Sequence, residues 1–208
     1  MGVNCRHCDA PLTTTFCDLG TSPLANSYVP EDRLNAGEVH YPLATFVCGE
    51  CFLVQLPEFE APSAIFSDYA YFSSYSDSWV EHARQFVDMA EARFGLDQSS
   101  HVIEIASNDG YLLQFFVEKG IPALGIEPAA NIAKVALETK GVESIVEFFG
   151  NPVATRLKDE GRTADLIIGN NVLAHVPNIN DFVASLKIAL NPEGVISIEF
   201  PHLLQLMR

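Results

Sequence analysis

Two pairs of cysteines, each spaced Cys-x-x-Cys, constrain the fold of this chain more than any other feature of its sequence. Cys5 and Cys8 form the first pair, and Cys48 and Cys51 form the second, some 40 residues later. Each turn brings two thiolates together, and four thiolates complete a tetrahedral zinc site with no open position for substrate. We therefore predict a small zinc-ribbon-like domain in which zinc is structural. A disulfide pairing of these cysteines is the alternative.

The segments beside the second cysteine pair are typical of short strands, because apolar residues flank the pair at Val47 and along Phe52–Leu56. Between the two pairs lies Asp18–Tyr28, which we interpret as a loop because Gly20 and Pro23 punctuate it. Loops of this length in compact modules often carry function. A polar turn packed on the ribbon is the other interpretation.

The charge of the chain argues against nucleic acid and against an anionic membrane as partners. The chain has 27 acidic residues and 12 lysines and arginines, which gives a formal net charge of −15, and its sequence contains no basic cluster. No apolar run reaches the roughly 18 residues of a membrane span, and the amino terminus has no apolar signal segment. We expect a cytoplasmic protein, because that reducing compartment favours metal-bound cysteines over disulfides.

From His101 onward, strand and helix patterns alternate, with Gly120, Gly141 and Gly161 as helix stops. This alternation predicts an α/β fold with a parallel, Rossmann-like sheet and helices on both of its faces. Ligands of such sheets bind at the carboxyl ends of the strands. The five expected strands are Val102–Ala106, Ala123–Glu127, Ser144–Phe148, Asp165–Gly169 and Val195–Phe200.

A stretch rich in rings and hydroxyls, Tyr69–Ser78, precedes the α/β pattern. It is suited to wall a polar ligand pocket, and an aromatic hinge between two domains is the alternative. Apolar residues then recur at helical spacing over Trp79–Phe94, which predicts a helix capped by Ser78 and ended by Gly95.

The first expected strand ends in Ala106-Ser-Asn-Asp-Gly110, which lacks the Gly-x-Gly-x-x-Gly of a dinucleotide site. The second ends at Glu127, whose carboxylate is suited to accept both hydroxyls of a ribose. With Glu104 in the first strand, this combination describes a site for S-adenosylmethionine (SAM) better than one for NAD. An oxidoreductase on a similar sheet is the alternative. The residues expected to hold the methyl donor are Glu104, Ala106, Ser107, Asn108, Asp109, Gly110, Glu127, Pro128 and Asn171.

Asn171 and His175 follow the fourth expected strand and therefore belong to the same rim of the sheet. His175 is a candidate site residue there, and a structural role at the start of the next helix is the alternative.

With these motifs together, the chain resembles the deoxysugar C-methyltransferases. Those enzymes join an amino-terminal zinc-binding domain, a central SAM-dependent class I methyltransferase domain and a carboxyl-terminal domain. The resemblance covers essentially the whole chain. It rests on the four paired cysteines, Asp18-Leu-Gly20 with Pro23 and Asn26, Tyr71-Phe-Ser-Ser74, Glu104–Gly110, Glu127-Pro128 and Asn171–His175.

The resemblance implies a nucleotide-linked ketosugar as substrate. A base removes a proton beside the ketone, and the resulting enolate takes the methyl group on carbon. Tyr71 and His175 match family positions that face the sugar, so they are candidates for orienting the ketone or relaying the proton. The family's base lies in a stretch after the fifth strand, and this chain ends at Arg208, just short of it.

We therefore expect the amino-terminal part of a longer enzyme, which binds SAM weakly and does not turn over. A non-catalytic module that binds SAM or a nucleotide beside a zinc ribbon is the alternative. The expected organisation is a zinc-binding domain over residues 1–62, an aromatic linker and docking helix over 63–98, and the first part of a methyltransferase domain over 99–208. The sugar, the methylated carbon and the oligomeric state stay open.

Overall fold

The computed structural model describes residues 3–208, which divide into two compact units. The first unit contains the chain up to Tyr71 together with Pro177–Asn180. The second contains Phe72–Val176 and Asp181–Arg208. Among the described residues, no helix combines the length and the apolar content needed to cross a lipid bilayer.

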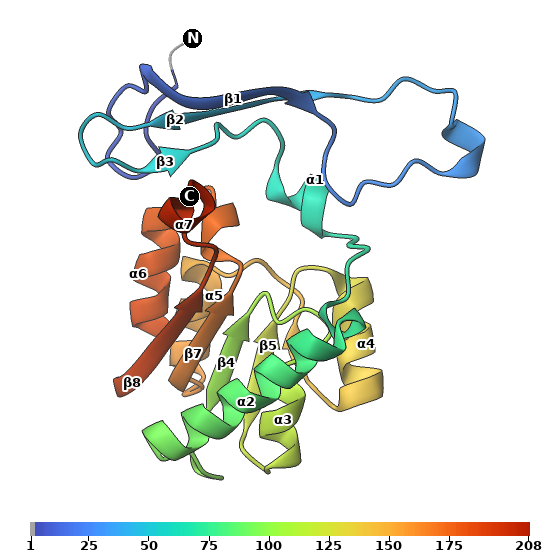
Figure 1. The fold of residues 1–208 in the computed structure, drawn as a ribbon. Helices are drawn as coiled ribbons and strands as arrows, with labels where there is room; N and C mark the ends of the chain where they lie inside the picture. Colours follow the sequence, from blue (N-terminus) through green and yellow to red (C-terminus); the bar gives the residue numbers. More distant parts are fainter. Residues whose placement is uncertain (1–2) are drawn as a thin grey trace. The chain divides into compact units, whose positions relative to one another are not determined.

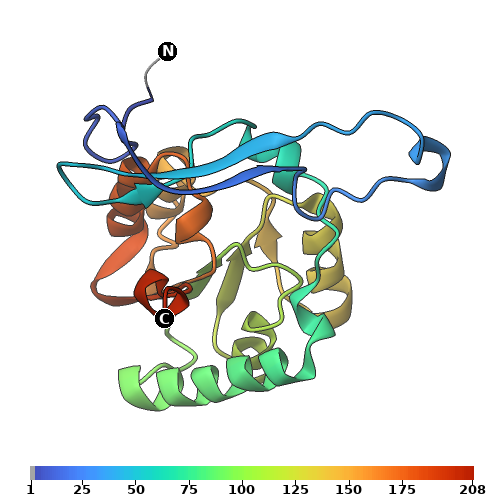
Figure 2. The same cartoon turned by 45° about the horizontal axis from the view of Figure 1, so that its top comes forward.

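The first unit is built on an antiparallel sheet of order β1-β2-β3, formed by Thr14–Ser22, Tyr41–Val47 and Val54–Gln55. The interpretation of Asp18–Tyr28 as a loop was therefore wrong for residues 18–22, which belong to β1; Asp18, Thr21 and Ser22 pair with β2. Residues 23–40 form the long connection between β1 and β2, which extends beyond the strands (Figures 1 and 2). It contains the short helix η1 (Glu31–Arg33), and helix α1 (Pro62–Phe66) follows β3.

The second unit contains the predicted parallel sheet, with five strands in the order β6-β5-β4-β7-β8. The central position of β4 and the reversal of strand order beside it match the doubly wound α/β architecture, whose ligands bind at this reversal. The bounds of the strands are β4 Val102–Ile105, β5 Ala123–Ile126, β6 Ser144–Ile145, β7 Ala164–Asn170 and β8 Leu190–Glu199. Compared with the sequence prediction, β6 is shorter and β8 begins earlier.

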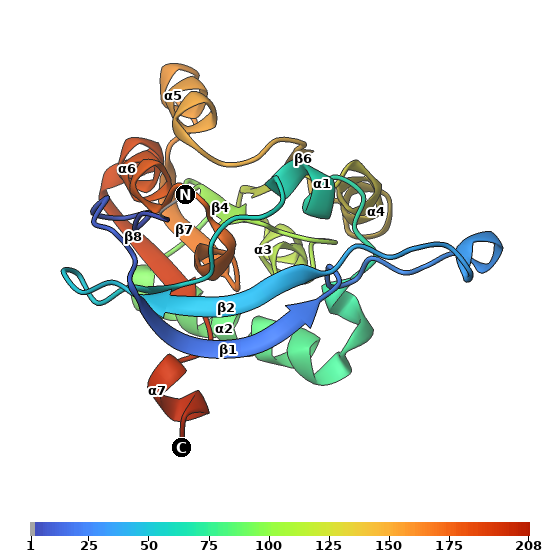
Figure 3. The ribbon, with the colours of Figure 1, turned by 90° about the horizontal axis from the view of Figure 1, so that it is seen from above.

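Helices cover both faces of this sheet. Successive side chains of the central strand point to opposite faces, so alternate residues pack against different helices. Val102 packs with residues of α2 and α3, whereas Ile103 and Ile105 pack with residues of α5 and α6 (Figure 3). The helices of the unit are α2 Asp77–Phe94, α3 Leu113–Glu118, α4 Ala130–Lys140, α5 Asn151–Asp159, α6 Ile179–Ala189 and α7 Leu203–Leu206. Short helical turns η2 and η3 span Ser73–Tyr75 and Leu173–His175.

Helix α2 begins two residues earlier than the sequence pattern indicated. Its N-cap is Ser76 rather than Ser78, because the Ser76 hydroxyl accepts a hydrogen bond from the Trp79 backbone N–H at 3.3 Å. Gly95 ends the helix as expected, in the left-handed conformation with φ of 66°.

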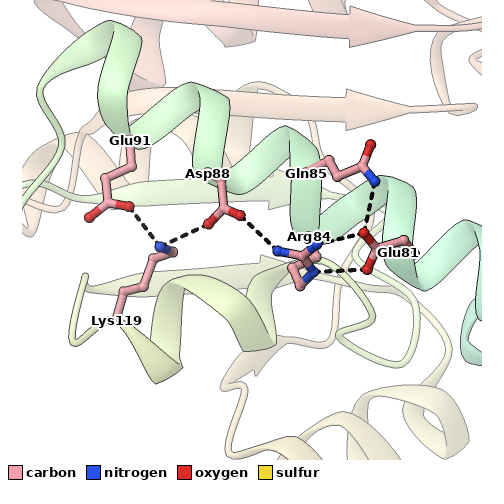
Figure 4. A network of polar contacts seen from close by, with 6 residues as sticks. All are labelled: Glu81, Arg84, Gln85, Asp88, Glu91 and Lys119. Carbon is pink, nitrogen blue, oxygen red and sulfur yellow. Dashed lines mark hydrogen bonds and ion pairs between the residues drawn. The ribbon is translucent and has the colours of Figure 1, made fainter.

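A row of charges on the outer face of α2 connects this helix to α3 (Figure 4). Arg84 bonds Glu81 and Asp88 on its own helix, while Lys119 at the end of α3 bonds Asp88 at 2.9 Å and Glu91 at 2.7 Å. The Arg84 guanidinium lowers the pKa of Glu81 to about 2. These side chains are largely exposed, so each pair contributes little to stability, and the row serves mainly to keep the helix surface soluble.

Candidate functional site

The four paired cysteines converge on one point of the first unit. Their sulfur atoms all lie within 4.8 Å of one another, with Cys5 and Cys51 Sγ at 3.6 Å and Cys8 and Cys48 Sγ at 3.5 Å. A disulfide requires about 2.05 Å, so no bond joins them. A tetrahedral zinc ion with Zn–S bonds of about 2.3 Å sets its sulfurs about 3.8 Å apart. The cluster therefore fits zinc.

Hydrogen bonds support the thiolate form of two of these ligands, Cys5 and Cys48. Gln55 in β3 donates its side-chain amide to Cys5 Sγ at 3.2 Å, and the Glu50 backbone N–H donates to Cys48 Sγ at 3.4 Å. The backbone N–H groups of Cys51 and Glu50 lower the pKa of the Cys48 thiol. Gln55 is 7% exposed, and sequence reasoning missed it because only the fold brings it under the first cysteine turn.

In the second unit, β4 ends in a tight loop, residues 106–110, at the carboxyl edge of the sheet. Ala106, Asn108 and Gly110 all have positive φ, at 56°, 50° and 73°. A Cβ on Gly110 would lie 3.0 Å from a methyl group of Val142, so this position needs glycine for space as well as for φ. The alternating conformation folds the loop back over the end of the strand.

Glu127, directly after β5, holds this loop in place. Its two carboxylate oxygens each accept one backbone N–H, from Asn108 and from Ala129, both at 2.9 Å. The residue is 5% exposed, and burial raises the pKa of its carboxyl, opposed by the Ala129 and Asn108 hydrogen bonds. Because a carboxylate oxygen has two lone pairs, each oxygen keeps one acceptor position for a ligand.

Two contacts fix the remaining polar side chains of the loop. Asn108 Oδ1 accepts the Ser73 backbone N–H at 2.8 Å, which connects the loop to η2. Lys140, the last residue of α4, lies 3.2 Å from Asp109 and forms an ion pair in which both side chains are largely buried. Ser73 belongs to the stretch Tyr69–Ser78 named from the sequence, whereas Lys140 did not stand out, because it lies 31 residues from Asp109.

Five buried oxygen atoms around the loop have no hydrogen-bond partner among the described residues. They are both carboxylate oxygens of Glu104, Ser107 Oγ, Asp109 Oδ1 and Ser144 Oγ. Gly125 gives the two hydroxyls room, since a Cβ there would lie 2.3 Å from Ser107 Oγ. Buried polar groups without partners are rare in folded proteins, and such a group calls for a ligand.

Glu104 is 1% exposed and points to the α2 side of β4. Burial, with the charges of Glu127 and Asp109, raises the pKa of Glu104 well above its usual range. Three carboxyls and one lysine therefore meet at this rim. These carboxyl oxygens suit a small polar ligand that donates hydrogen bonds.

The other side of the rim is formed by the ends of β7 and β8. The Asn170 side-chain amide donates to the Tyr111 hydroxyl at 3.3 Å, and the Asn171 backbone N–H donates to the Glu199 carbonyl oxygen at 2.7 Å. Asn171 has a left-handed φ of 54° and is exposed. The sequence pattern named Asn171 for this rim but missed Asn170 and Tyr111.

The two candidates for substrate contact lie in different units. His175 closes η3 and keeps exposed surface, while partial burial of its imidazole lowers its pKa. Tyr71 ends the first unit, is 47% exposed, and its ring packs edge-on against Tyr69 at 6.4 Å. Pro128 is half-buried beside Glu127.

Both parts of the chain match known families. Residues 5–66 match the family described as "Putative zinc binding domain", and residues 79–206 match the family described as "Methyltransferase domain".

Relatives and a solved structure extend this comparison. The chain is 31% identical over 204 residues to the C-methyltransferase NovU of Streptomyces niveus, covering 98% of this chain and 48% of NovU. It is 25% identical over 118 residues to a ubiquinone biosynthesis O-methyltransferase of Mesorhizobium japonicum, covering 53% of this chain and 47% of that one. The chain spans about half the length of the curated relatives it matches. The crystal structure of PH0226 from Pyrococcus horikoshii superposes with a TM-score of 0.54 at 18% identity, over 72% of this chain and 70% of that one, and it shares the fold.

Proposed function

The chain belongs to the methyltransferase domain family, and on that premise we propose that it binds SAM and serves methyl transfer to a carbon of a nucleotide-linked ketosugar. NovU, the relative that aligns with nearly the whole chain, is named a C-methyltransferase, which supports carbon as the methylated atom. The sugar rests on the resemblance in Tyr71-Phe-Ser-Ser74 and Asn171–His175.

One observation carries the donor part of the proposal. The loop after β4 and the carboxylate after β5 meet through the bond from Asn108 N–H to Glu127, and unpartnered buried oxygens surround them. SAM supplies a methyl group on a positively charged sulfur, so an acidic, polar rim fits it. The residues that would hold it are Glu104, Ala106, Ser107, Asn108, Asp109, Gly110, Glu127, Pro128 and Asn171.

Within that set, the chain's own groups have separate tasks. Glu127 would accept the two hydroxyls of a ribose, because each of its oxygens keeps one free acceptor position. The left-handed residues of the loop hold the backbone close against the ligand. Tyr71 and His175 would orient the ketone or relay its proton.

The metal site has a structural task in this proposal. Four cysteine ligands leave no coordination position for substrate, so zinc would hold the ribbon together and take no part in the chemistry. We propose residues 1–62 as this zinc-binding domain, 63–98 as linker and docking helix, and 99–208 as methyltransferase domain. A reducing compartment such as the cytoplasm is part of this proposal, because zinc-binding cysteines stay reduced there.

Calorimetric titration of SAM into the zinc-loaded chain tests the proposal. We expect binding that Glu127→Gln weakens by about 10-fold or more, because a hydrogen bond to a charged group contributes about 1.5–3 kcal/mol. Glu138→Gln, on the exposed face of α4, is the matched control and should leave the affinity unchanged. A chain that binds no SAM, or whose affinity is the same in both variants, would contradict the proposal.

A further inference from the structure

The side chain of Gln55 lies where the two cysteine turns of the first unit meet. Strands β2 and β3 pair so that Gln55 stands opposite Phe46, two residues before Cys48. This register fixes Gln55 beside the cluster, where it is 7% exposed. A buried amide whose donors and acceptor lacked partners would destabilise the fold, so the partners of Gln55 indicate its role.

The Gln55 amide bonds the first cysteine turn twice. Its Nε2 donates to Cys5 Sγ at 3.2 Å, and its Oε1 accepts the Arg6 backbone N–H at 2.9 Å. Because that N–H can only donate, it selects the amide oxygen, and the amide nitrogen is left facing the sulfur. Four thiolates carry more negative charge than one Zn²⁺ balances, so a donor aimed at a sulfur stabilises the occupied site.

The same amide is connected to the second cysteine turn. Its Nε2 also lies 3.4 Å from the Leu53 carbonyl oxygen, and that oxygen accepts the Cys48 backbone N–H at 3.0 Å. Hydrogen bonds therefore run from Cys48 through Leu53 and Gln55 to Cys5, which belongs to the other cysteine pair. Glutamine suits this position because one side-chain end offers both donors and an acceptor.

The first turn needs such links because it comes from a separate part of the chain. Cys5 and Cys8 lie on a hairpin that β1, the long connection and β2 separate from the second turn. That hairpin closes on itself, with the Cys5 N–H bonded to the Ala10 carbonyl oxygen. The Arg6 guanidinium bonds the Leu56 carbonyl oxygen and adds to the junction. Holding both turns in place before the ion arrives lowers the entropic cost of metal binding.

We propose that Gln55 is the positioning residue of the metal site, which holds the first cysteine turn against the second and donates a hydrogen bond to a ligand sulfur. This inference rests on the zinc part of the proposed function and involves neither the methyl donor nor the sugar. Replacing a residue that hydrogen-bonds to a metal ligand typically weakens metal binding by about 10- to 100-fold. Gln55 therefore sets how tightly the ribbon binds zinc.

Competition with a chromophoric chelator of known zinc affinity tests the inference on the whole chain. Gln55→Glu has the same size and keeps an oxygen for the Arg6 N–H, but its carboxylate cannot donate to Cys5 Sγ. We expect this variant to bind zinc about 10-fold or more weakly than the unmodified chain. Gln55→Leu, which loses every one of these bonds, should also lose about 10-fold or more.

Tyr41→Phe is the matched control. It removes the bond from the Tyr41 hydroxyl to Glu60 at 2.7 Å in the same sheet, away from the sulfur atoms, and should keep the zinc affinity within about 2-fold. Saturating Co²⁺, whose visible absorption reports tetrahedral thiolate coordination, checks that each variant still folds its four-cysteine site. If Gln55→Leu does not fold, Gln55→Glu decides the question alone.

Two results would overturn the inference. If Gln55→Glu binds zinc as tightly as the unmodified chain, donation to Cys5 is not needed and Gln55 only braces the turn. If both Gln55 variants lose no more affinity than Tyr41→Phe, Gln55 does not position the ligands at all. An unmodified chain that takes up no zinc would refute the metal site itself. The SAM titration tests the donor site separately, so either proposal can fail alone.

Discussion

Glu127→Ala is expected to destabilise the second unit by about 2–4 kcal/mol, independently of any ligand. The substitution removes the acceptor of two buried backbone N–H groups, those of Asn108 and Ala129. A buried donor left without a partner costs about 1–3 kcal/mol. Two such donors lower the free energy of unfolding by up to about 6 kcal/mol, and the loss of a buried charge offsets part of this decrease.

Glu127→Gln should cost at most half as much as the alanine variant. Its amide oxygen still accepts one N–H, and it no longer buries a charge. The sign of the pH dependence separates these two effects. Because burial raises the pKa of Glu127 from 4.5, protonation favours the folded chain, and this contribution is lost as pH rises through the folded pKa. The stability advantage of the wild type over Glu127→Gln should therefore be largest below about pH 4.5 and shrink as pH rises toward neutrality.

Urea unfolding followed by tryptophan fluorescence measures this prediction, since Trp79 is the single tryptophan and stacks on Tyr111 beside the loop. Glu138→Ala is the control, because Glu138 is a surface residue of α4 whose loss should change stability by less than about 0.5 kcal/mol. If Glu127→Ala costs no more than Glu138→Ala, the carboxylate does not anchor the loop, and the account of the site is wrong.

Three further perturbations test other parts of the structure. Cys48→Ser should abolish the binding of one zinc equivalent, measured by metal analysis of the purified chain, whereas Cys17→Ser, outside the cluster, should retain it; equal zinc content in both variants would refute the four-cysteine site. Gly110→Ala should destabilise the second unit by about 1–3 kcal/mol in urea unfolding, because its φ is 73° and Val142 fills the space of a Cβ; a neutral or stabilising effect would contradict this. The free energy of unfolding of Glu104→Gln, relative to that of the wild type, should rise as pH increases from about 5 to 8. The reason is that the pKa of Glu104 is raised in the folded chain, so the wild type loses stability over that range. A difference that does not vary with pH would mean that this carboxyl titrates normally.

The parallel sheet could be predicted from the sequence because its strands are apolar on both faces and alternate with helices that end at glycines. β1 could not, since eight of its nine residues are exposed and carry no burial pattern. The end of β6 was also misjudged, because only Gly125 and Ile126 of β5 face it, so its pairing stops at Ile145.

For the candidate site, the sequence pattern predicted which loops reach the rim but not how their side chains bond. The cysteine spacing was sufficient for the metal cluster, since four ligands leave little geometric choice. The bonds from Asn108 to Glu127 and from Lys140 to Asp109 depend on how β4, β5 and α4 align in space. The stack of Trp79 on Tyr111 depends in the same way on how α2 crosses the sheet.

The placement of the metal ligands has a consequence for how this protein is made. All four cysteines lie within the first 51 of 208 residues, so the ribbon can close around its ion before the second unit is fully synthesised. The central strand β4 is different, because its partner β7 emerges only after β5, β6 and the helices α3, α4 and α5. Until then β4 has one edge open and its apolar faces incompletely covered, which invites aggregation. We expect the nascent chain to depend on zinc supply early and on chaperones late.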